Sequence, residues 1–153
     1  MPRIEEQIDV AARPSGAFRL CHDADRRPEW DERVGRMKVL TPKPTRRGTL
    51  VRVDGCPPTG GPVFSWEGEF VAYSYPSHSR LEVLDAAPSS PFADASEEWR
   101  FERRGEGTRV TLVWNYQPRG ILGRIADTLV RRRKTRRAVQ QSLENLKRAL
   151  EGG

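Results

Sequence analysis

Apolar and polar residues alternate along most of the chain, and a helical spacing replaces the alternation near the C-terminus. Alternation with a period of two is typical of a strand with one buried face. It predicts strands at residues 3–10, 34–41, 49–54, 62–75, 80–86, 96–103 and 108–117. After the first strand, Pro14 can begin a short helix, and the stretch DRRPEWDERVG predicts a turn and a second short helix.

The longest predicted strand, at 62–75, has the clearest pattern. Phe64, Trp66, Gly68 and Phe70 share one face, and mostly polar residues share the other. Gly68 has no side chain in mid-strand, which predicts a bend or bulge that helps the sheet to curl. Two later strands alternate in the same way, and their inner faces carry Glu97, Trp99, Phe101, Val110, Leu112, Trp114 and Tyr116.

From about Gly120 the spacing of apolar residues becomes that of a helix. One stripe contains Leu122, Ile125, Leu129, Val139, Leu143, Leu146 and Leu150. A helix of about 30 residues is about 45 Å long and would cross a whole small domain. Arg132 and Arg136 continue the three-four spacing between Leu129 and Val139, so two arginines interrupt the apolar face.

Together these elements predict an α+β fold in one domain of residues 1–153, with a curved antiparallel sheet of seven strands, two short helices and a long C-terminal helix. No run of about 18 apolar residues occurs, and acids stand where a signal peptide would be apolar, so we expect a cytoplasmic protein. Cys21 and Cys56 lack metal-ligand spacing with His22 or His78. We expect two free thiols, and neither a metal nor a cofactor.

Three stretches of the chain agree, in their order, with a known family. IDVAARPSGAFRLCHDADRRPEWDERV contains an apolar strand, a Pro-led helix, an Asp and a Pro-x-Trp turn, here Ile8 and Val10, Pro14 and Phe18, Asp23 or Asp25, and Pro28 to Trp30. GEGTRVTLVWNY is similar to the family's late strand, and SLENLKRALE to the end of its closing helix. The chain thus resembles the START-like (SRPBCC, Bet v 1-like) superfamily, in its polyketide cyclase/dehydrase and lipid-transport group.

This resemblance implies the helix-grip fold, with a cavity between sheet and helix. Members of the superfamily bind lipids, polyketides or isoprenoids, or catalyse cyclisation and dehydration, so the fold leaves the function open. The expected lining of the cavity comprises Phe64, Trp66, Phe70, Glu97, Trp99, Phe101, Leu112, Trp114 and Tyr116 from the sheet, and Ile125, Leu129, Arg132 and Arg136 from the helix. For each aromatic residue, the alternative is that it simply fills the core.

Glu97 is the carboxylate of most interest, because the alternation points it into the interior. A buried carboxylate must be paired, protonated or near water. Arg132 or Arg136 could pair with it or bind the acidic end of a ligand. The alternative is that the helix diverges from the sheet at this point, so that both arginines reach solvent.

For catalysis, Glu97 with Tyr116 is the one pair that the sequence supports, and no Ser-His-Asp order or metal-ligand cluster stands out. The leading hypothesis is therefore a protein that binds an apolar or amphipathic small molecule. A polyketide cyclase or dehydratase is the alternative, and whether the protein is an enzyme stays undecided.

The positive charge lies near the C-terminus. Residues 1–118 carry 17 Lys and Arg against 18 Asp and Glu, and residues 119–153 carry 10 against 3, for net charges of −1 and +7. The run from Arg131 to Arg137 is either a solvated face or, beside Ile121, Leu122 and Ile125, an amphipathic helix that binds an anionic membrane or a partner. Nucleic acid is a less expected partner, because no recognised binding motif accompanies the charge. The oligomeric state is left open.

Overall fold

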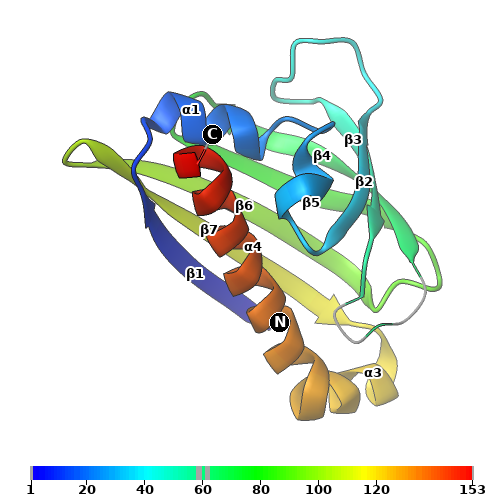
Figure 1. The fold of residues 1–153 in the computed structure, drawn as a ribbon. Helices are drawn as coiled ribbons and strands as arrows, with labels where there is room; N and C mark the ends of the chain where they lie inside the picture. The colour runs from blue at the N-terminus through cyan, green and yellow to red at the C-terminus, as the bar shows by residue number, and fades with distance from the viewer. Residues whose placement is uncertain (1, 58–59, 61–62, 153) are drawn as a thin grey trace.

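Seven strands form one curved antiparallel sheet in the order β1-β7-β6-β5-β4-β3-β2 (Figure 1). The computed structural model describes residues 2–57, 60 and 63–152. The strands are β1 (Arg3–Val10), β2 (Val34–Val39), β3 (Leu50–Gly55), β4 (Phe64–Ser74), β5 (His78–Ala86), β6 (Phe92–Arg104) and β7 (Gly107–Pro118). The prediction of the fold is confirmed, and each predicted strand is present. The strand predicted from residue 62 begins at Phe64, and residue 62 itself lies outside the described residues.

Helices cover the concave face of this sheet. Two short helices, α1 (Pro14–Cys21) and α2 (Arg27–Trp30), lie between β1 and β2. The long helix α4 (Arg132–Gly152) packs against β1, α1 and α2, and it runs across the sheet toward α1 (Figure 1). In the described part of the chain, no helix has the length and the apolar composition that crossing a membrane requires.

The predicted long C-terminal helix is present without a break, but it is not a regular α-helix throughout, so its apolar residues do not form the single stripe that the spacing predicts. It begins as α3 (Gly120–Ala126), widens into the π-helical turn η1 (Asp127–Arg131) and continues as α4. A π turn adds one residue to the turn, so the residues before it are rotated by about 100° relative to the stripe that follows. Val139, Leu143 and Leu146 are buried as predicted, whereas Ile125 and Leu129 are 52% and 67% exposed.

Gly68 lies where β4 bends. The pairing of β4 with β5 shifts register between Glu67 and Gly68, which confirms the predicted bulge. A Cβ atom on Gly68 would lie 2.9 Å from the carbonyl oxygen of Glu82 and 2.9 Å from the Trp66 ring. The curl of the sheet thus brings backbone and ring closer than a side chain would allow.

The interior is packed at the end of the sheet that α1 covers. Phe18 of α1 packs edge-on against Phe101 and Tyr73 and stacks on His22 at 4.0 Å between ring centroids. His22 is held by the carbonyl oxygen of Phe18 and the hydroxyl of Ser79, and burial lowers its pKa to about 4. A neutral histidine in this position is part of the core.

We predict that Gly68→Ala lowers the free energy of unfolding by about 1–3 kcal/mol, because the Glu82 carbonyl cannot move aside without disturbing the strand pairing. Gly16→Ala in α1 is the matched control, since a methyl group there meets nothing within 4 Å. That substitution should raise stability by up to about 1 kcal/mol. Urea denaturation measures both variants, and equal effects would contradict the close approach at Gly68.

Candidate ligand-binding cavity

A cavity of about 510 Å³ lies at the other end of the sheet, under α3, η1 and the start of α4. Its volume is within the range of small-molecule sites, about 300–1,000 Å³. Aromatic residues form much of its wall, with Phe92 packed edge-on against Phe64 and Trp114. Of the residues predicted to line a cavity, the wall contains Phe64, Trp66, Glu97, Trp114 and Tyr116.

The other predicted lining residues lie elsewhere. Phe70, Trp99, Phe101 and Leu112 share the concave face, but they belong to the packed end, where α1 and α2 fill the space above them. Ile125 and Leu129 are outside the wall, because the π turn rotates them toward solvent. The helical side of the wall is formed instead by Leu122, Gly123, Ala126, Asp127, Arg131 and Thr135.

A cluster of four charged side chains, of which three are buried and Arg33 is largely so, separates the packed end from the cavity. The two carboxylates, Asp31 and Glu97, are 0% and 4% exposed. Arg27 donates to Asp31 at 2.8 Å and to Glu97 at 2.6 Å, and Arg33 donates to the same two carboxylates at 2.8 and 3.4 Å. Two arginines and two carboxylates have no net charge, so the cluster is neutral as a unit.

Each charge in the cluster keeps its ordinary ionisation because the others are present. Burial by itself would raise the pKa of Glu97, but the charges of Arg27 and Arg33 outweigh it and lower that pKa below its usual value. The same balance holds the pKa of Asp31 well below its usual range. Glu97 is therefore an ionised acceptor and a poor candidate for a general acid.

Aromatic rings enclose the cluster on both sides. The Arg27 guanidinium lies 5.0 Å from the centre of the Trp30 ring and 5.4 Å from that of Trp99, and the Arg33 guanidinium lies 5.4 Å from that of Trp114. Cation–π contacts of this kind strengthen when they are desolvated. Arg33 and Glu97 also line the cavity, so the cluster forms a polar part of its wall.

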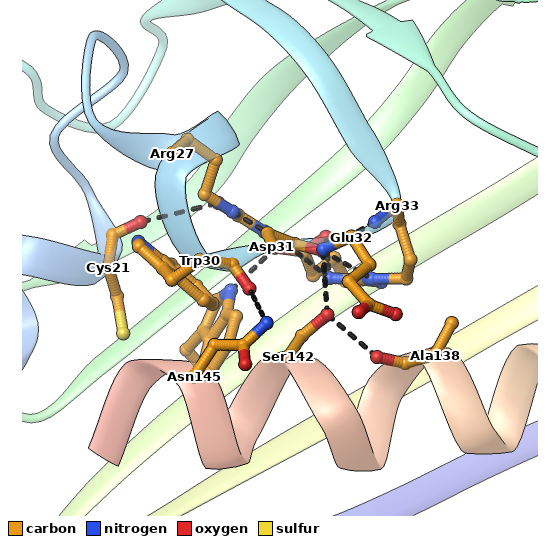
Figure 2. A network of polar contacts seen from close by, with 11 residues as sticks. Cys21, Arg27, Trp30, Asp31, Glu32, Arg33, Ala138, Ser142 and Asn145 are labelled. Atoms are coloured by element: carbon orange, nitrogen blue, oxygen red, sulfur yellow. Dashed lines mark hydrogen bonds and ion pairs between the residues drawn. The ribbon is translucent and has the colours of Figure 1, made fainter. Parts of the chain in front are cut away.

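Helix α4 is tied to the segment that carries these charges (Figure 2). The Ser142 hydroxyl accepts a hydrogen bond from the backbone N–H of Glu32 at 2.9 Å and lies 3.3 Å from a carboxylate oxygen of Asp31. The Asn145 amide donates to the backbone carbonyl of Trp30 at 3.1 Å. The buried cluster and the closing helix are therefore positioned together.

Neither predicted helix arginine reaches Glu97. Arg132 donates to Asp127 at 3.0 Å, and Arg136 pairs with Glu6 of β1. Both arginine side chains are 44% exposed, so they reach solvent where the helix leaves the sheet. The arginine partners of Glu97 come instead from α2 and from the turn that precedes β2.

Tyr116 pairs with Asp127 and not with Glu97. Its hydroxyl donates to the Asp127 carboxylate, and both residues lie on the cavity wall. Burial and the hydrogen bond to Asp127 raise the pKa of Tyr116 above its ordinary value. The phenol thus remains protonated, and Asp127, which also binds Arg132, is fully engaged.

Two other cations lie on the wall near the start of the helical segment. Arg119 donates to the carbonyl oxygens of Ser90 and Phe92, and Arg131 is half-buried. Within the described residues, neither of them has a carboxylate partner. Their positive charge is therefore not balanced locally.

The family model for polyketide cyclase/dehydrase and lipid transport matches residues 1–151 of the chain. The chain belongs to this family. Among curated proteins, none matches it in sequence.

Several solved structures have a similar fold, although their sequence identity to this chain is low. A protein from Thermus thermophilus has 21% identity and a TM-score of 0.80, with 97% of each chain covered. The Zhui aromatase/cyclase from Streptomyces sp. R1128 has 18% identity and a TM-score of 0.72, with 99% of this chain and 98% of that chain covered. Major latex-like protein 151 from Panax ginseng has 10% identity and a TM-score of 0.73, with 98% and 97% covered. These similarities show that this member of the polyketide cyclase/dehydrase family shares its fold with the three proteins.

Several wall residues of this family member were not predicted from sequence, namely Arg33, Phe92, Arg119, Asp127, Arg131 and Thr135. The segment from Arg27 to Arg33 carried a signal, since Arg27 and Asp31 stand four residues apart, the spacing of an ion pair on a helix. Asp127 is the one acid in the segment 119–137, and that isolation also marked it. The described residues contain no group of three or more His, Cys, Asp or Glu side chains that could hold a metal.

We predict that Glu97→Gln lowers the free energy of unfolding by about 3–5 kcal/mol at neutral pH, because Arg27 and Arg33 lose half of the charge opposing them. Glu98→Gln is the control, since Glu98 pairs with Arg100 and His78 nearer the surface. This substitution should lower the free energy of unfolding by less than about 1 kcal/mol.

The pH dependence of this difference provides a second measurement. The pKa of Glu97 in the folded protein is below its ordinary value of 4.5, so its stabilisation is complete above that value and is lost as pH falls through the lowered pKa. The gap between wild type and Glu97→Gln should shrink in acid. A gap that is independent of pH would contradict the ionised state of Glu97.

Proposed function

We propose that this protein binds an amphipathic small molecule, with its apolar body in the cavity and an acidic end near Arg119 and Arg131. One observation carries the proposal: the aromatic cavity of about 510 Å³ has cations on its wall that lack carboxylate partners among the described residues. Membership of a family described by polyketide cyclase/dehydrase and lipid transport supports a ligand of this class.

The acidic end of the ligand is assigned to these cations because the other charges of the wall are already balanced. Arg33 faces two carboxylates, and an added anion there would meet Asp31 and Glu97 at short range. Asp127 would repel an anion directly, although Arg132 offsets its charge. Arg119 and Arg131 carry no such opposition, so an anion gains most near them.

A second function, cyclisation or dehydration of a polyketide-like substrate, is favoured by the position of Tyr116 and Asp127 on the wall. The protonated Tyr116 hydroxyl could donate a proton, and Asp127, held by Arg132, would position that hydroxyl. Under this hypothesis Tyr116→Phe abolishes turnover of a linear polyketide thioester and leaves probe binding unchanged. Turnover by Tyr116→Phe at the wild-type rate would contradict the role of Tyr116 as a proton donor.

We predict that the protein binds 8-anilinonaphthalene-1-sulfonate and its uncharged analogue N-phenyl-1-naphthylamine. Arg131→Gln should weaken binding of the sulfonate about tenfold, because a charge-assisted hydrogen bond contributes about 1.5 kcal/mol or more. The same substitution should leave binding of the uncharged probe unchanged. Arg133→Gln, an exposed neighbour outside the wall, is the control. Fluorescence titration measures the affinity of each of the two variants for each of the two probes. An equal loss of affinity for both probes in Arg131→Gln would contradict an anion site.

Filling the cavity tests the site itself. Ala126→Trp places an indole into the space under α3, so both probes should bind more than about tenfold more weakly, a loss of over about 1.4 kcal/mol. Thr128→Trp adds the same group two residues on, at an exposed position outside the wall, and should bind as wild type. Native mass spectrometry of the purified protein gives an independent readout, because a co-purified apolar molecule should be lost from the Ala126 variant alone.

A further inference from the structure

The start of the C-terminal helical segment exposes a large apolar surface beside the cavity. We define the lip as Ile121, Leu122, Ile125 and Leu129, which are 76%, 82%, 52% and 67% exposed. Three of them stand four residues apart, and Leu122 lies next to Ile121, so together they form one ridge. Apolar side chains scattered singly on a surface are ordinary, but a contiguous ridge marks an interaction site.

The lip also borders the cavity. Leu122 is both part of the lip and part of the cavity wall, and the adjoining Gly123 belongs to the wall alone. In Figure 1, α3 projects at the end of the molecule away from α1 and from the loop that joins β2 to β3. A flat partner could therefore meet the lip without touching the packed end.

The segment that carries the lip, residues 119–137, has an excess of positive charge, and its one acid is buried. Residues 119–137 contain eight Lys and Arg and one acid, Asp127, which is 1% exposed. Arg133 and Lys134 are exposed and follow Leu129 by about 6–8 Å along the helix axis, which is within the Debye length of about 8 Å at physiological ionic strength. A surface that binds the lip would also interact electrostatically with Arg133 and Lys134.

From this combination we infer that the lip docks on an anionic lipid surface. A bilayer offers an apolar interior for the lip and anionic headgroups for the flanking cations, and amphipathic helices of this composition lie at the interface. A second copy of the chain would bring another segment with the same excess of positive charge, so self-association through the lip is opposed by repulsion. Docking would also bring the cavity to a source of amphipathic molecules, a consequence that rests on the proposed function.

Flotation with lipid vesicles tests the docking. The wild-type protein should bind vesicles of phosphatidylcholine and phosphatidylglycerol in equal parts, bind pure phosphatidylcholine vesicles far more weakly, and release from the acidic vesicles at high salt. Absence of binding to either vesicle, or equal binding to both, would overturn the inference.

Two variants separate the contributions of charge and apolar contact. Arg133→Ser with Lys134→Ser should weaken binding to acidic vesicles about thirtyfold, at about 1 kcal/mol for each cation. Lys38→Ser with Arg47→Ser removes the same two residue types from exposed positions outside the helical segment and should bind as wild type. Ile121→Ser with Leu129→Ser should weaken binding at least about tenfold, with Leu40→Ser and Leu84→Ser as the exposed control pair.

Other partners for the lip give different results. A dimer that the Ile121→Ser and Leu129→Ser variant abolishes would assign the surface to self-association and overturn the inference. So would binding to duplex DNA that depends on Arg133 and Lys134 while vesicle binding is absent. Titration with N-phenyl-1-naphthylamine in the absence of lipid keeps the two proposals apart: a failure of wild-type protein to bind the probe contradicts the cavity, and a failure to float contradicts the docking.

Discussion

The neutral cluster of Arg27, Asp31, Arg33 and Glu97 is the constraint on which the rest of the interior depends. Removing any one member would leave a buried charge without its partner, and such a loss costs several kcal/mol. All four must therefore be brought together by the same fold, although Glu97 lies 64 residues or more from both arginines along the chain. The cluster fixes how α2 and the turn between α2 and β2 pack against β6.

The cluster also lies at the border between two different ends of the interior. On one side, α1 and α2 supply Phe18 and Trp30 to cover the concave face, and the core closes. On the other side, the covering elements are α3 and η1, which expose Ile121, Ile125 and Leu129 and leave a cavity beneath them. The aromatic side chains of β4, β6 and β7 therefore face a space that the protein itself does not fill.

The π turn connects this cavity to the surface. The turn itself contributes Asp127 and Arg131 to the cavity wall. Its wider winding leaves Ile125, just before the turn, and Leu129, within it, exposed to solvent. A continuous α-helix would present Ile125 and Leu129 on the same stripe as Val139 and extend the core. The same local irregularity thus accounts for the hollow interior and for the exposed lip, and π turns of this kind are frequent at functional sites.

The sequence alone determined the fold, because period-two and three-four spacings report which face of each element is buried. It also determined which residues of the sheet face inward, so Phe64, Trp66, Glu97, Trp114 and Tyr116 were found. It did not determine the partner of Glu97, since spacing along a helix says nothing of which of several arginines comes near in space. Nor did it reveal the π turn, which changes the phase of a stripe without changing its composition. Those features depend on how the helices close over the sheet, and only the tertiary structure decided them.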